Sequence, residues 1–126
     1  MIFELEIKEK MYKFKFGLGF MREIDAKKKQ DVNGLEKNVG LIQAVAGIMD
    51  GELDTLADVL FIANKTENPR LTMGAIDEYL ENVEDLDGLF ETVLDFLSKA
   101  NATKKTVANL KAMIAEEEAK QANKEA

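Results

Sequence analysis

Hydrophobic and charged residues alternate over most of the first sixteen positions. A period of two is typical of strands with one buried face, so this stretch predicts an antiparallel β-hairpin. A turn at Glu9-Lys10 is one way to join the strands, and a four-residue loop over residues 8–11 gives the same pairing and stays open. Either loop pairs Phe3 with Phe16, Leu5 with Phe14 and Ile7 with Tyr12 across the apolar face.

After Gly17 the apolar residues are spaced three and four apart, which is typical of helices. We predict a first helix over about residues 19–30, a loop at 31–34 and a second helix that Asn38 caps. A third helix ends before Pro69, Thr72 caps the fourth, the fifth spans about 85–100 and the last follows residue 103. These elements give an α+β fold that is mostly α, with an N-terminal β-hairpin followed by about six helices.

Two features of the helical part bear on packing and on domain limits. Gly40, Ala44 and Gly47 lie on the second helix and indicate close approach of another helix, most simply one of the same chain. Beyond Ile114 no large apolar residue follows. We therefore expect one α+β domain over residues 1–114 and a charged C-terminal tail over 115–126, which either continues as a solvated helix or frays.

Composition removes most kinds of site chemistry. The chain has no His and no Cys, so we expect no thiolate or imidazole catalysis and none of the common zinc, haem or copper sites. An EF-hand centred on Gly88 would need oxygen ligands at Val83 and Leu94, so that pattern fails as well. Gly17 and Gly19 form neither a dinucleotide fingerprint nor a convincing PDZ-type carboxylate loop. We accordingly expect no catalytic residue, no metal and no cofactor.

The charge is unevenly distributed. The net charge is −7, and no basic residue lies between Arg70 and Lys99. Such an acidic surface repels phosphate, which argues against nucleic acid as a partner. No charge-free apolar stretch is long enough to span a membrane, and Glu4 and Glu6 interrupt the segment where a signal peptide would need an apolar core. The sequence therefore predicts a cytoplasmic protein without a membrane partner.

The fifth helix carries more apolar residues than one buried stripe requires. Leu94 and Phe96 widen its apolar arc, either as a partner-binding surface or because the helix is buried on two sides. Met21 and Met49 are further candidate contacts, since flexible methionine side chains adapt to varied partners. These four residues are the candidate partner-binding residues.

The segments 12–17 and 19–25, a hairpin strand that leads into a helix, resemble the start of siphophage tail assembly chaperones of Gram-positive hosts. The order of the middle helices, the acidic fifth helix and the Lys-rich end are also similar to that family, over about residues 3–120. The resemblance implies an adaptor that is not an enzyme. It would bind the tape measure protein, keep it soluble and recruit the major tail protein in the host cytoplasm.

Four further points stay open. The resemblance does not decide whether the chain self-associates or whether a longer, frameshifted form exists. A generic cytoplasmic helical adaptor or regulatory subunit is the alternative function, because it would share the acidic surface and bind another protein. A small enzyme that uses carboxylates and Lys would need a pocket with acids of divergent pKa, which the sequence does not locate.

Overall fold

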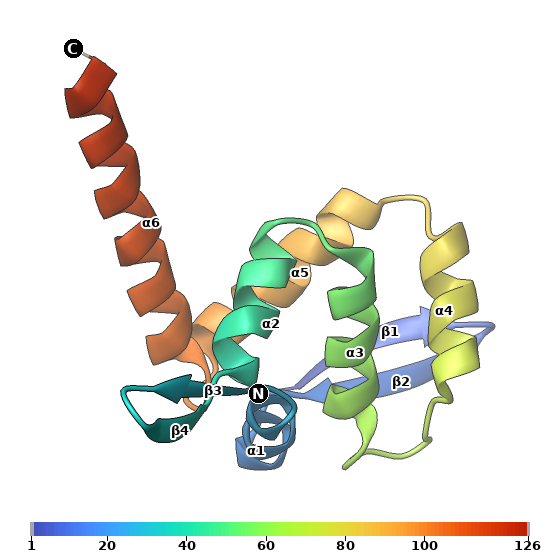
Figure 1. Cartoon of the computed structure of the whole chain (residues 1–126). Helices are drawn as coiled ribbons and strands as arrows, with labels where there is room; N and C mark the ends of the chain where they lie inside the picture. Colours follow the sequence, from blue (N-terminus) through green and yellow to red (C-terminus); the bar gives the residue numbers. More distant parts are fainter. Residues whose placement is uncertain (1, 126) are drawn as a thin grey trace.

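Two β-hairpins and six helices follow one another in the computed structural model, which describes residues 2–125 (Figure 1). The predicted α+β, mostly α fold is confirmed, including the N-terminal hairpin and the number of helices. The elements are β1 (Ile2–Ile7), β2 (Lys10–Lys15), α1 (Leu18–Ala26), β3 (Lys29–Val32), β4 (Leu35–Asn38), α2 (Gly40–Met49), α3 (Leu53–Asn64), α4 (Met73–Asn82), α5 (Leu86–Lys99) and α6 (Lys104–Glu125).

The register of the first hairpin differs from the predicted one by two residues. Phe3 lies opposite Phe14, not Phe16, and the pairing continues through Leu5 with Tyr12 and Ile7 with Lys10. The turn is at Lys8 and Glu9, whose φ angles of 50° and 67° give the left-handed turn that suits the twist of a two-residue hairpin. A shift of two residues leaves the same face buried, so alternation alone could not distinguish the two registers.

The second hairpin, β3–β4, was not predicted. We expected a helix through Gln30 and an Asn38 cap on the next helix, and both expectations are wrong. Asn33 and Gly34 form a two-residue turn with φ angles of 54° and 83°, and Lys29 pairs with Asn38 across the strands. Because Asn38 belongs to β4, the N-terminus of α2 is capped instead by Asp25 of α1, whose carboxylate accepts a hydrogen bond from Leu41 N–H at 3.2 Å.

Helices α1 and α2 approach each other closely at Gly40, as the small residues of α2 indicated. A Cβ added to Gly40 would lie 1.9 Å from the carbonyl oxygen of Ile24 and 2.8 Å from that of Asp25. Gly47 makes a similar approach to Thr55 of α3, where a Cβ would lie 2.7 Å from the hydroxyl oxygen. The small residues of α2 therefore serve packing within the chain, and they fix one flank of α2 against α1 and α3.

The later helices begin close to the predicted positions, and the predicted Thr72 cap is confirmed. The Thr72 hydroxyl accepts a hydrogen bond from Ala75 N–H at 3.1 Å, and the Asp85 carboxylate accepts one from Gly88 N–H at 3.0 Å. Each satisfies a backbone donor that the first turn of a helix leaves free. The segment between α3 and α4 is held by Asn64, a buried side chain that also reaches β2.

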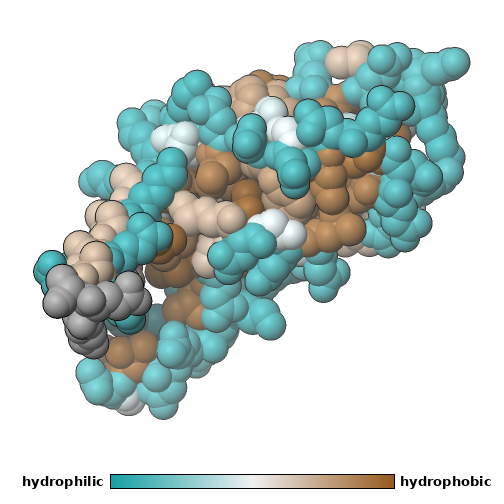
Figure 2. Space-filling model, turned by 90° about the horizontal axis from the view of Figure 1, so that it is seen from above, coloured by the Kyte–Doolittle hydropathy of each residue, from teal (hydrophilic) through white to brown (hydrophobic). Residues whose placement is uncertain are grey.

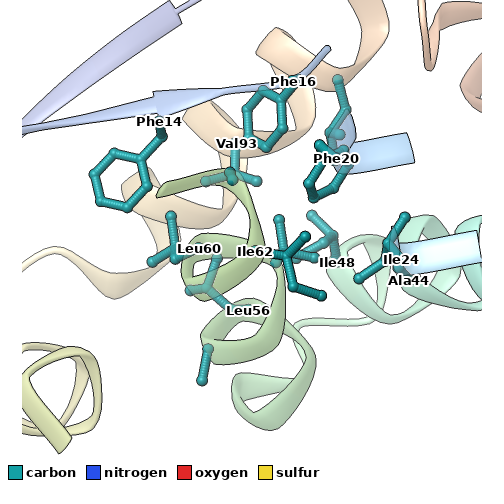
Figure 3. Packing of buried hydrophobic residues seen from close by; sticks show 14 of the residues in the cluster. Phe14, Phe16, Phe20, Ile24, Ala44, Ile48, Leu56, Leu60, Ile62 and Val93 are labelled. Carbon is teal, nitrogen blue, oxygen red and sulfur yellow. The ribbon is translucent and has the colours of Figure 1, made fainter. Parts of the chain in front are cut away.

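The core lies between the β1–β2 hairpin and the helices that cover its apolar face. In Figure 3 the side chains of Phe14, Leu60 and Val93 point toward one another from β2, α3 and α5. Aromatic rings extend this core along the hairpin. Phe3 stacks on Phe14 with centroids 5.0 Å apart, and Phe16 meets Phe20 edge-on, also at 5.0 Å. The hairpin and α1 are thereby fixed as one packed layer.

Helix α6 begins in the core and then leaves it. Val107 is buried, whereas every residue from Lys111 to Asn123 is exposed, and the helix projects away from the other elements (Figure 1). At 22 residues it is about 33 Å long at 1.5 Å per residue. Within residues 2–125, no helix combines the length and the apolar composition needed to cross a membrane.

Candidate protein-binding surface

The candidate residues Leu94 and Phe96 are both partly buried on α5. The Phe96 ring lies 5.0 Å from the ring of Phe3, so this side chain connects α5 to β1. Leu94 packs against the core as well. Successive residues of a helix turn by about 100°, so residues i and i+2 are about 200° apart. Leu94 and Phe96 therefore lie on opposite flanks of α5 and do not form one face.

The two candidate methionines lie on other helices. Met21 belongs to α1 and Met49 ends α2, and both are partly buried against the core. Each of the four candidates thus exposes only part of its side chain. The structure places them on three helices, α1, α2 and α5, and their role as contacts stays a prediction.

Other apolar residues, on α6 and α2, are much more exposed than these four candidates. On α6, Met113 is 64% exposed and Ile114 is 42% exposed, while Leu110 one turn earlier is partly buried. The spacing of three and four residues places them on one side of the helix. Ile42 of α2 is 50% exposed. It lies about 200° around α2 from Gly40, on the flank turned away from α1, and α2 packs against α6.

We call the set Ile42, Leu110, Met113 and Ile114 the α6 surface. The β3–β4 hairpin lies at the foot of α6 in Figure 1 and adds two exposed residues, Val32 and Leu35, at its turn. Figure 2 shows hydrophobic side chains around a hollow beside α6. Exposed apolar groups gathered from three elements are typical of a site that another protein covers.

Only part of the signal for the α6 surface lies in the sequence. The sequence shows Leu110, Met113 and Ile114 spaced three and four apart on the last helix, inside the domain expected over residues 1–114. The Asn33-Gly34 turn signal, flanked by Val32 and Leu35, was also visible. What the sequence could not show is that α6 leaves the core after its first turns.

Charge distinguishes the first half of α6 from α4 and α5. The acidic residues of α4, α5 and their junction are all exposed, and none of them lies on α6: Asp77, Glu78, Glu81, Glu84, Asp85, Asp87, Glu91 and Asp95. Glu78 pairs with Lys8 and Asp95 with Lys99, each at 2.9 Å. The first half of α6 carries Lys104, Lys105 and Lys111 and no acidic residue.

Several hollows lie between the elements of the described chain. One of about 340 Å³ between α1, α2 and α3 contains Lys27 and Asp58, whose charged groups are 4.0 Å apart. Among residues 2–125, no three carboxylates cluster in a way that could hold a metal ion. Burial raises the pKa of the Tyr79 hydroxyl above its ordinary value.

An exposed apolar surface on a projecting helix, with acidic helices α4 and α5 in the same molecule, is typical of a protein-binding module. Comparison with known proteins agrees with this class. A family model described as phage tail assembly chaperone protein, TAC, matches residues 4–111, which is most of the chain. The chain therefore belongs to the phage tail assembly chaperone family. No curated protein and no solved structure matches it.

Proposed function

We propose that this protein binds the tape measure protein of its phage, keeps it soluble in the host cytoplasm and brings it to major tail protein subunits. The role is that of an adaptor without chemistry of its own. The observation that carries the proposal is the exposed α6 surface on a member of the tail assembly chaperone family.

The α6 surface suits a helical partner. Leu110, Met113 and Ile114 present apolar groups along one side of α6, and Ile42 is exposed on α2, the helix that packs against α6. A partner helix that lays its apolar face here would bury the exposed parts of these side chains, and each would contribute about half of the roughly 1.5–3 kcal/mol that burial of a fully exposed side chain provides. The net charge of −7 would keep the resulting complex dispersed.

Met21, Met49, Leu94 and Phe96 are proposed as secondary contacts at the edges of their helices. We also propose that residues 1–114 fold as a unit and that 115–126 extend α6 as a charged helix. Leu110 is the last residue of α6 that packs against the core, which supports this division. The charged extension would carry Glu116 and Lys120 into solvent, where they lie 3.8 Å apart.

Co-expression with the tape measure protein encoded beside this chain tests the proposal. The wild-type chain is expected to raise the soluble yield of the tape measure protein and to co-purify with it. A Met113→Lys, Ile114→Lys double variant should lose both effects. Ala112→Lys, Ala115→Lys is the matched control, because it adds the same charge on the opposite side of α6.

Three results would count against the proposal in different ways. An insoluble partner with wild-type chain present would reject the tape measure protein as the client and favour another cytoplasmic partner. Rescue by wild type and by both variants would reject the α6 surface as the contact. Equal loss in both variants would show that added charge, not the apolar side of α6, decides binding.

A further inference from the structure

The two outer edges of the β1–β2 hairpin differ in whether other parts of the chain cover them. Along β2, helix α3 packs against the strand, and the side-chain amide of Asn64 donates a hydrogen bond to the carbonyl of Lys13 at 3.0 Å. Along β1, no backbone hydrogen bond within residues 2–125 reaches the outer edge. One edge of this two-stranded sheet is therefore covered and the other is open.

The turn identifies which groups of β1 face outward. In a two-residue hairpin the flanking residues, here Ile7 and Lys10, exchange both hydrogen bonds, and such pairs then alternate along the ladder. The backbone N–H and C=O groups of Phe3 and Leu5 consequently point toward β2. Those of Glu4 and Glu6 point away from it. Lys13, the partner of Glu4, agrees with this pattern, since its carbonyl points outward to Asn64.

The space beside β1 is hollowed and partly apolar. A hollow of about 600 Å³ lies between β1, α4 and α5, with Leu5, Tyr79 and Leu89 among its walls. A second hollow shares Tyr79 with the first and continues to Ile7 near the turn. The pair of Lys8 with Glu78 and the contact of the Phe3 and Phe96 rings place α4 and α5 on this side of the hairpin (Figure 1).

The charges around this edge are mostly acidic. The side chains of Glu4 and Glu6 are exposed on the outer face of β1, and Glu6 lies opposite an uncharged residue, Met11. Glu91 and Asp95 of α5 stand at the hollow. A strand added to this edge would place alternate side chains beside Glu4 and Glu6 and the others toward the apolar walls.

We propose that the outer edge of β1 binds an extended segment of a partner protein by strand addition, and that this segment alternates Lys or Arg with apolar residues. Basic side chains would pair with Glu4 and Glu6, and apolar ones would enter the hollow between α4 and α5. The backbone groups of Glu4 and Glu6 supply the hydrogen bonds. The site is separate from the α6 surface and does not depend on the function proposed above.

Charge also opposes a second copy of the chain as the occupant. Antiparallel pairing of two β1 edges would bring Glu4 and Glu6 of one copy next to those of the other. Like charges on neighbouring strands are destabilising, and charged edges are a known protection against association between copies. The acidic edge thus selects a basic strand.

Titration with a synthetic peptide tests this proposal on the full chain. The probe is a ten-residue peptide of alternating Lys and Val, and a Glu and Val peptide of the same length is its control. On binding of the basic peptide, the amide protons of Glu4 and Glu6 should exchange with solvent at least about tenfold more slowly, because a new ladder protects them. The Leu5 amide, already bonded to β2, should change little.

Two substitutions separate the backbone contact from the charge. Glu4→Pro removes an outward N–H without breaking the ladder to β2 and should weaken binding by about tenfold or more. Glu4→Gln keeps that N–H and should weaken binding by only about threefold. Circular dichroism checks that both variants fold, and the exchange measurement on wild type decides the question if the Pro variant does not.

Other outcomes overturn the proposal. Absence of binding, or equal binding of the acidic peptide, would reject the charge argument. Binding of the basic peptide with unchanged exchange at Glu4 and Glu6 would place the contact elsewhere, for example on the acidic faces of α4 and α5. Loss of tape measure binding alone would leave this result unaffected, so the two proposals fail independently.

Discussion

Asn64 joins β2, α3 and the segment that leads to α4, and its replacement by Leu should cost much of the stability of the fold. The side chain is 1% exposed. Its amide donates to the carbonyls of Lys13 at 3.0 Å and Pro69 at 3.1 Å, and its oxygen accepts from Leu71 N–H at 2.6 Å. Leu has a similar size, so Asn64→Leu removes the three hydrogen bonds while leaving only a small change in volume.

The expected loss follows from these bonds. Each intramolecular hydrogen bond contributes about 1 kcal/mol net, and the buried N–H of Leu71 would lose its partner, so the free energy of unfolding should fall by about 3 kcal/mol. A chain of this length is expected to have a free energy of unfolding of roughly 6–19 kcal/mol. At an unfolding entropy of about 2.1 cal/mol/K per residue, 3 kcal/mol corresponds to a decrease in Tm of about 11 °C.

Urea unfolding followed by far-ultraviolet circular dichroism measures the change. Asn82→Leu is the matched control, because the Asn82 amide also donates to a backbone carbonyl, that of Glu78 at 2.8 Å, but is exposed. The control should lose less than about 0.5 kcal/mol. A difference between the two variants below about 1 kcal/mol would refute the reasoning, since burial of the Asn64 bonds would then contribute little.

Two further predictions concern packing and titration. Gly40→Ala should lower the free energy of unfolding by about 1–3 kcal/mol or more, because the new Cβ meets the Ile24 carbonyl. Its control, Gly74→Ala, has nothing within 4 Å of the new Cβ and should be neutral or stabilising. Equal urea midpoints of the two variants would contradict this prediction. Tyr79 should ionise above its ordinary pKa of about 10 in a Tyr12→Phe variant, as followed by phenolate absorbance. Because the unfolded chain loses this proton first, stability should fall as the pH rises from about 10 through the folded pKa, and a pH-independent stability there would contradict burial as the cause.

The sequence predicted the helices better than the strands, for a physical reason. Thr72 and Asp85 are local signals, because each cap satisfies a donor within its own first turn. Strand pairing is not local in this sense. The two registers of the first hairpin bury the same side chains, and Phe3 stacks on both Phe14 and Phe16, at 5.0 and 5.7 Å, so the apolar face alone does not select the register.

The β3–β4 hairpin was missed because none of its strand residues is buried. Without a buried face there is no alternation to detect, and the lysines at 27–29 suggested the end of a helix. Only Asn33-Gly34 indicated the turn. The predicted Asn38 cap was wrong for the same reason, since that residue pairs in β4 and Asp25 reaches α2 from another helix.

The exposure of apolar residues on α5 and α6 could not be predicted from their spacing in the sequence. Surplus hydrophobicity on α5 drew attention to Leu94 and Phe96, yet Phe96 packs on Phe3, which lies 93 positions away in the sequence. Ordinary apolar spacing on α6 drew none, although Met113 and Ile114 are exposed. Whether an apolar stripe faces the core or solvent depends on where the helix lies, which its own sequence does not contain.

The contact between Phe3 and Phe96 has a consequence for synthesis on the ribosome. The aromatic hairpin is complete at Phe16, but its cover at Phe96 emerges 80 residues later, after roughly 4–16 s at 5–20 residues per second. A hairpin forms in about 1–10 μs, and alone it is at best marginally stable. The nascent hairpin therefore opens and closes many times, and the part of its aromatic face that Phe96 covers, at Phe3, stays accessible to host folding factors until α5 arrives.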